Sequence, residues 1–168
     1  MISTLIGLVM ITISVMAQMA IVRHLPLLNG TADLVLVVLS AWALHERAEG
    51  AWVWALIAGV LTGLISAMPF YVPLVSYLAV AGIASLLRSR IWQSPILAMF
   101  VTVFIGTLFY HFLSIFTLQF LQQISIGWQE SLNLVTLPSL VLNLLITLPL
   151  YAVINDLAGW VYPAEAEL

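Results

Sequence analysis

The chain contains no cysteine, and Lys, Arg, Asp and Glu together make up only 7% of its 168 residues. Without cysteine it can form neither a disulfide framework nor a thiolate metal site. Soluble domains are about one-quarter charged, so this composition excludes an ordinary soluble fold. The four basic residues, against a net charge of -3, cannot form the basic surface that nucleic-acid binding requires.

Charged side chains are also missing from the middle of the hydrophobic segments. All seven acidic residues fall at the ends of predicted helices, in loops or in the tail: Asp33, Glu46, Glu49, Glu130, Asp156, Glu165 and Glu167. No carboxylate pair is expected at mid-depth for acid–base catalysis, and the three histidines show no metal-ligand spacing. We therefore predict a protein that is not an enzyme and that needs no cofactor.

Hydrophobic residues, in contrast, make up 64% of the chain, and the mean hydropathy is +1.18. A helix crosses the hydrocarbon core of a bilayer with about 20 apolar residues. The sequence therefore predicts an all-α integral membrane protein, a single domain of about six transmembrane helices with almost nothing outside the bilayer. The predicted helices span residues 2–22, 32–44, 51–68, 74–87, 96–121 and 132–155 of the domain 1–168.

Local signals set the ends of these helices. The first segment lacks a basic leader and is longer than a signal-peptide core, so we expect a retained helix. Pro26 ends it, and either Thr31 or Asp33 can cap the short second helix. Pro69 and Pro73 are expected to bracket a tight turn.

The arginines predict the orientation in the membrane. Arg47, Arg88 and Arg90 fall in two loops on one side, whereas only Arg23 falls on the other. Because arginine-rich loops stay in the cytoplasm, both termini are expected there. Arg47, Arg88 and Arg90 are all interpreted as cytoplasmic anchors. For Arg88 and Arg90, which would lie at the headgroups, contact with a cytoplasmic partner is the alternative.

Small residues recur at every fourth position of the third predicted helix. Ala51, Ala55, Gly59 and Gly63 would form a seam that allows another helix to approach closely. The seam either packs inside the protein or joins it to a partner or a second copy.

Polar residues in the fifth and sixth predicted helices form a second candidate site. Tyr110 and His111 lie well inside the fifth helix, and Asn143 is expected at nearly the same depth in the sixth. His111 and Asn143 could satisfy one another inside the bundle, or these groups could contact a partner or a ligand.

Several stretches, taken in order, resemble the rod shape-determining protein MreD, a family of the bacterial inner membrane. The matching stretches are Leu25-Pro26-Leu27-Leu28 with Gly30 and Asp33-Leu34, Ala58-Gly59-Val60-Leu61 with Leu64-Ile65-Ser66 and Pro69, Tyr77-Leu78, Leu86-Leu87-Arg88-Ser89-Arg90, Thr107-Leu108-Phe109-Tyr110, Leu137-Pro138-Ser139-Leu140-Val141-Leu142-Asn143 and Leu148-Pro149-Leu150-Tyr151. The chain departs from the family pattern at Ala32, where proline is common, and at Gly63 and His111, where acidic residues are common.

The resemblance implies a non-enzymatic scaffold of the elongation complex that maintains cell shape and builds lateral peptidoglycan. Its direct partner would be an MreC-like single-pass protein, which connects it to a RodA-like glycosyltransferase, a class B penicillin-binding protein and the MreB cytoskeleton. The family's fold is similar to that of the substrate-binding subunits of energy-coupling-factor vitamin transporters. The alternative function is therefore small-molecule binding, for which only Trp128, Gln129 and Glu130 suggest a pocket.

Overall fold

The computed structural model describes residues 2–45, 50–90, 94–125 and 127–161. This part of the chain is helical and contains no strand, only an isolated bridge between Leu27 and Gly30. The helices are α1 (Ile2–Ala20), the 3-10 helix η1 (Val22–His24), α2 (Leu34–Leu44), α3 (Ala51–Ile65), α4 (Tyr71–Arg90), α5 (Pro95–Phe116), the π-helix η2 (Thr117–Leu121), α6 (Trp128–Ser131), the π-helix η3 (Leu132–Thr136) and α7 (Leu137–Val161).

Four helical segments are long and apolar enough to cross a membrane: Thr4–His24, Tyr71–Ser89, Pro95–Leu121 and Trp128–Val161. The other two main helices, α2 and α3, have only 11 and 15 residues. At 1.5 Å per residue α2 is about 17 Å long, well short of a hydrocarbon core of about 30 Å. The described part of the chain is therefore all-helical, with four helices of membrane-spanning length.

Several predicted helix boundaries were wrong by three residues or more. α3 ends at Ile65 rather than at residue 68, and α4 begins at Tyr71 rather than at residue 74. Pro73 lies in the first turn of α4, where the N–H that proline lacks would have no partner within the helix, so only Pro69 precedes the helix. The last helical segment begins at Trp128 and continues through Pro149 to Val161.

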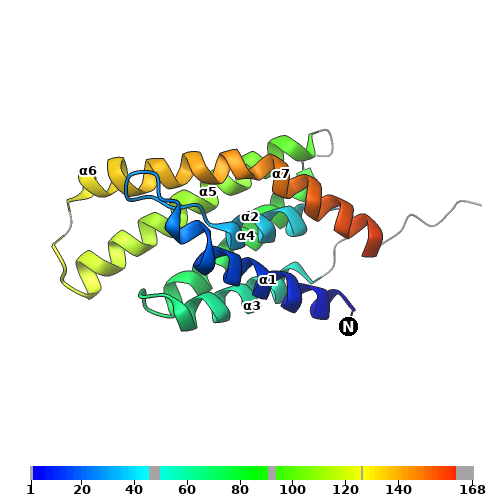
Figure 1. Ribbon diagram of the computed structural model, residues 1–168, viewed down its shortest axis with the longest axis horizontal. Helices are drawn as coiled ribbons and strands as arrows, with labels where there is room; N and C mark the ends of the chain where they lie inside the picture. The colour runs from blue at the N-terminus through cyan, green and yellow to red at the C-terminus, as the bar shows by residue number, and fades with distance from the viewer. Residues whose placement is uncertain (1, 46–49, 91–93, 126, 162–168) are drawn as a thin grey trace, which may run out of the picture.

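The main helices lie lengthwise beside one another (Figure 1). The start of α1 and the end of α7 lie at the same end of the bundle (Figure 1). The connections 21–33, 66–70 and 122–125 lie at the opposite end, which we call the loop end. The chain thus enters and leaves the bundle on the same side.

The short helix α2 forms the centre of the bundle. Every residue from Val35 to Leu44 is buried, and α1, α3, α4, α5 and α7 all pack against it. A helix that is apolar on all sides is typical of such an enclosed position. Trp42 of α2 stacks on Trp54 of α3 with ring centroids 4.0 Å apart. α2 can be short because its neighbours, rather than lipid, surround it.

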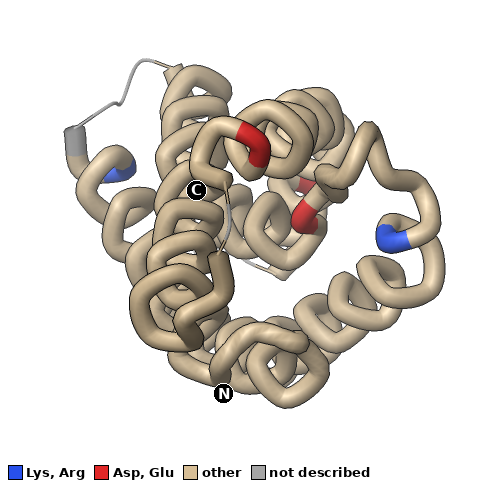
Figure 2. The backbone as a smooth tube through the Cα atoms, turned by 90° about the vertical axis from the view of Figure 1, so that its left-hand side faces the viewer, with Lys and Arg blue, Asp and Glu red and all other residues tan. Residues whose placement is uncertain are grey.

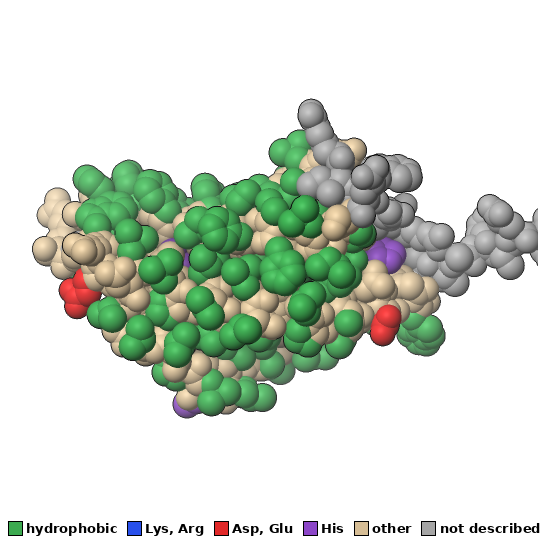
Figure 3. Space-filling model, turned by 90° about the horizontal axis from the view of Figure 1, so that it is seen from above, with side chains coloured by type: hydrophobic (Ala, Val, Ile, Leu, Met, Phe, Trp, Pro, Cys, Tyr) green, Lys and Arg blue, Asp and Glu red, His purple; other side chains and the backbone are tan. Residues whose placement is uncertain are grey.

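The outer surface is largely apolar. Hydrophobic side chains cover most of the face in Figure 3, and Figure 2 shows few charged positions along the backbone. Large exposed hydrophobic residues lie along α1, α5 and α7, for example Ile13, Phe104 and Leu145. Such a surface is stable against hydrocarbon rather than water, because lipid imposes no penalty for leaving it unburied.

The small-residue seam of α3 faces other elements of the same chain. Ala51, Ala55 and Gly59 are buried, and a Cβ added at Gly59 would lie 2.7 Å from the Cα of Leu74 on α4. A Cβ added at Gly63 would lie 2.7 Å from the Phe70 ring. α4 is also the most extensive neighbour of α3. The seam therefore brings α3 and the start of α4 close together inside the protein.

We predict that Gly59→Leu destabilises the protein by about 1–3 kcal/mol, because the added side chain would overlap the α4 backbone. The matched control is Gly159→Leu in α7, where an added Cβ would meet nothing within 4 Å. Unfolding of both variants in detergent micelles measures the difference. Equal stability of the two variants would show that α3 and α4 are not closely packed at Gly59.

Candidate site: a polar cavity at the start of α2

The first turn of α2 starts inside the bundle, where its free backbone N–H groups need partners other than water. Asp33 is the N-cap, and its Oδ1 accepts a hydrogen bond from the Leu36 N–H at 2.9 Å. Gln18 of α1 accepts from the Leu34 N–H at 2.9 Å and donates to the Ala32 carbonyl at 2.6 Å. The Gln18 side chain thus connects α1 to two backbone groups at the start of α2, the Leu34 N–H and the Ala32 carbonyl.

Side chains of α7 satisfy the residues just before α2. The Asp33 N–H donates to Asn143 Oδ1 at 2.6 Å, and the Thr31 N–H donates to Ser139 Oγ at 3.0 Å. Ser139 and Asn143 are four residues apart and therefore lie on the same face of α7. Gly30 is required here, because a Cβ would lie 2.6 Å from both the Ser139 N and the Val135 carbonyl oxygen.

Asn143 also connects α7 to α5. Its Nδ2 donates to Thr107 Oγ1 at 2.9 Å, and both side chains are buried. The predicted pairing of Asn143 with His111 was wrong, because Thr107, one turn earlier on the same face of α5, takes this position. His111 instead meets the ring of Tyr110 edge-on, with centroids 5.9 Å apart.

The carboxylate of Asp33 is bound from the other side by α4. The Tyr77 hydroxyl donates to it, at 3.1 Å from Oδ2 and 3.2 Å from Oδ1. The Tyr77 ring lies 6.1 Å from that of Tyr110, centroid to centroid. Hydrogen bonds around Asp33 therefore join α1, α2, α4, α5 and α7.

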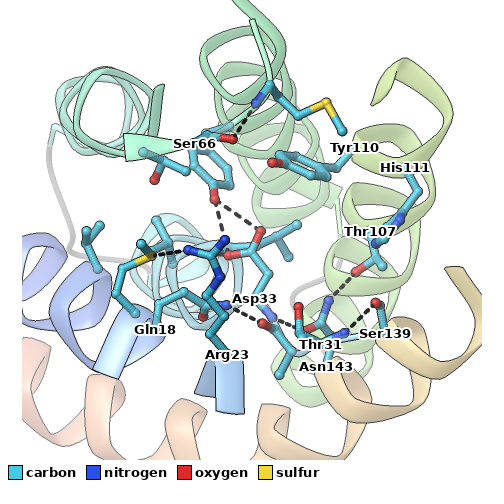
Figure 4. A pocket seen from close by; sticks show the side chains of 18 of the residues that line it. Gln18, Arg23, Thr31, Asp33, Ser66, Thr107, Tyr110, His111, Ser139 and Asn143 are labelled. Carbon is cyan, nitrogen blue, oxygen red and sulfur yellow. Dashed lines mark hydrogen bonds between the residues drawn. The ribbon is translucent and has the colours of Figure 1, made fainter. Parts of the chain in front are cut away.

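These groups surround a cavity of about 320 Å³, which we call the α2 cavity. It extends inward from the loop end, where Arg23 and Asn29 are exposed, to the buried Tyr77, Thr107 and Asn143. Figure 4 shows the polar side chains that converge on it from several helices. Its polar lining residues are Gln18, Arg23, Asn29, Thr31, Asp33, Thr62, Ser66, Tyr77, Thr107, Tyr110, His111, Ser139 and Asn143.

The structure brings four of the predicted site residues together: Asp33, Tyr110, His111 and Asn143 all line the α2 cavity. Asp33 is at a helix end, as predicted, but that end lies on an internal cavity. The sequence placed Asp33 at a helix end but did not indicate that it lines a cavity.

The remaining predicted residues lie elsewhere. Pro138 is buried in the first turn of α7 beside Ser139, whereas Pro149 is exposed farther along the same helix. Arg88 donates to the His45 carbonyl at 3.3 Å. Arg47 lies outside the described residues, and for Arg90 only the backbone is described.

The pocket suggested by the sequence around Trp128 is not the cavity that the structure contains. Trp128 packs on Phe112, with ring centroids 6.1 Å apart, and does not line the α2 cavity. Sequence reasoning also missed Gln18, Tyr77, Thr107 and Ser139. Gln18, Thr107 and Ser139 are polar residues within apolar helices. Such a residue indicates an internal contact, but the sequence does not show which residue it contacts.

No protein-family model, characterised protein or solved structure matches this chain. The site is therefore interpreted from its own geometry. Within the described residues, no three His, Asp or Glu side chains gather to hold a metal ion.

We predict that Asn143→Leu destabilises the protein by about 1–3 kcal/mol, because it leaves the Asp33 N–H without a partner. Combined with Thr107→Val, the effects should be non-additive, with a coupling of about 0.6 kcal/mol as is typical within membranes. Combined with His111→Leu, they should be additive. A double-mutant cycle of unfolding free energies tests both pairs, and coupling to His111 alone would contradict the observed network.

Proposed function

We propose that this protein is a non-enzymatic membrane scaffold of the MreD type, which binds an MreC-like partner in the elongation complex. One observation carries the proposal. Two stretches that resemble the family, one with Gly30 and Asp33-Leu34 and the other at residues 137–143, are far apart in sequence but are joined by the hydrogen bond from the Asp33 N–H to Asn143. The nearby Thr31 N–H donates to Ser139 of the second stretch. Residues that carry the resemblance therefore lie together in the structure, and this supports the proposal.

The surface of the protein also supports a scaffold. Among the described residues, the connections between helices are short and the helix faces are apolar. A partner would therefore bind within the membrane, through helix packing, as the transmembrane segment of a single-pass protein would. Such a complex would support cell shape and lateral peptidoglycan synthesis through the RodA-like glycosyltransferase, the penicillin-binding protein and MreB.

The proposed location is the bacterial cytoplasmic membrane, with both termini in the cytoplasm. The arginine asymmetry supports this orientation, and the structure places the start of α1 and the end of α7 at one end of the bundle. In this orientation the loop end, with Arg23 and the mouth of the α2 cavity, faces the periplasm.

The partner is tested by extracting the tagged protein from its native membranes in mild detergent and identifying what accompanies it. We predict recovery of a single-pass protein with a periplasmic domain, and its loss when a tagged, unrelated membrane protein of similar size is used instead. Recovery of ATPase subunits and a stoichiometric vitamin, without such a partner, would contradict the scaffold.

The orientation is tested with single cysteines, since the chain has none of its own. Ser89 and Ser125 are both exposed, at opposite ends of the bundle. We predict that an impermeant thiol reagent labels Ser125→Cys on intact spheroplasts, whereas Ser89→Cys reacts only after lysis. The reverse pattern would invert the topology.

A second candidate function is a small-molecule-binding subunit of a membrane transporter. The α2 cavity favours it, because its largely apolar wall carries several polar groups and two tyrosines. The scaffold remains our first proposal, because the network around Asp33 uses most of the cavity's polar groups to hold the helices together.

A further inference from the structure

Most polar groups of the α2 cavity already have structural partners. Gln18 is bound through both its amide oxygen and its nitrogen, and so is Asn143. Ser139 accepts from the Thr31 N–H. These side chains satisfy the backbone before α2, and their presence needs no ligand.

Two charged groups on the cavity wall are different. The Asp33 carboxylate accepts hydrogen bonds from the Leu36 N–H and the Tyr77 hydroxyl, but no cation pairs with it among the described residues. Arg23 makes one weak side-chain contact, 3.8 Å from Nη1 to the sulfur of Met19, and no described carboxylate pairs with it. The cavity therefore carries one negative and one positive charge without an ion-pair partner.

The positions of the two charges define a polarity. Asp33 is bonded to the buried Tyr77, whereas Arg23 is an exposed residue of the connection 21–33. Figure 4 shows both side chains at the cavity. An ammonium group beside Asp33 would also meet the rings of Tyr77 and Tyr110, whose faces attract cations. An oxyanion near the mouth would suit the planar, multiply donating guanidinium of Arg23.

We propose that the α2 cavity binds a small zwitterion, with its ammonium group at Asp33 and its phosphate or carboxylate at Arg23. The volume of about 320 Å³ lies at the small end of the range for ligand pockets, and suits a molecule of a few to about twenty heavy atoms. Two sources share this chemistry: a free amino or phosphoamino compound, and the headgroup of an ethanolamine phospholipid.

Binding is measured by calorimetry on the purified protein in detergent, with O-phosphoethanolamine and β-alanine as probes. Ethanolamine and inorganic phosphate, each carrying only one of the two charges, are the reference compounds. Asp33→Asn removes the carboxylate charge while keeping an oxygen that can cap α2. Arg23→Gln removes the other charge at an exposed position, and Asp156→Asn, at an exposed position of α7 far from the cavity, is the control.

We expect one or both zwitterions to bind more tightly than either reference compound. Asp33→Asn and Arg23→Gln should each weaken binding about tenfold or more, as loss of a charge-assisted hydrogen bond does, and Asp156→Asn should not change it. Equal binding of the zwitterions and their one-charge references would overturn the proposal, as would binding that neither cavity variant affects.

The lipid source is examined separately, in nanodiscs of phosphatidylethanolamine and of phosphatidylglycerol. If a lipid headgroup fills the cavity, the protein should be more stable in phosphatidylethanolamine, and Asp33→Asn should remove this difference. If a free compound fills it, the soluble probes should bind in both lipids. If the soluble probes do not bind and phosphatidylethanolamine does not stabilise the protein, the proposal is overturned. Coupling of Asp33 and Arg23 in a double-mutant cycle of stability would then identify an internal ion pair instead.

This inference does not depend on the proposed partner. Ligand binding is measured on the isolated protein, whereas the scaffold is tested by what accompanies it from native membranes. Either result can fail while the other stands.

Discussion

The fold depends on satisfying the backbone where α2 begins inside the bundle. The first N–H groups of a helix have no partner within the helix, and the interior of a membrane protein provides little water to replace it. Asp33 caps the helix from within, Gln18 binds the backbone from α1, and Ser139 and Asn143 bind it from α7. These partners come from three parts of the chain, so satisfying one helix end also fixes the positions of its neighbours.

The same constraint explains why the polar cavity and the structural network occupy one place. The helix start needs several polar side chains close together, and the same side chains line the cavity. The Tyr77 hydroxyl reaches the Asp33 carboxylate from α4, and Thr107 receives the amide of Asn143 from α5. The cavity is therefore held by interactions that also stabilise the fold, and a variant that removes binding without unfolding the protein must preserve the cap, as Asp33→Asn does.

The position of Asp33 bears on both proposed functions, the scaffold and the small-molecule-binding subunit. A bundle without internal charge would offer partners little besides its apolar helix faces. The observed carboxylate, with Arg23 toward the mouth of the same cavity, adds an internal site of defined polarity. A scaffold that holds a small zwitterion or a lipid headgroup would combine both features, since the proposed partner would bind the outer helix faces and the proposed ligand the interior.

The sequence by itself determined the class of fold and most helix positions, because the length of an apolar run and the local signals at its ends are encoded in consecutive residues. It also identified Asp33 as a candidate helix cap and Tyr110, His111 and Asn143 as candidate polar contacts. Only the tertiary structure decided that α2 is enclosed, that Gly59 packs against Leu74, and that Asn143 pairs with Thr107 rather than with His111. Thr107 and His111 lie one turn apart on the same face of α5, so the sequence pattern alone does not show which of them contacts a given residue of α7. The packing of the helices sets which of the two lies within hydrogen-bonding distance, and that depends on contacts between segments distant in the sequence.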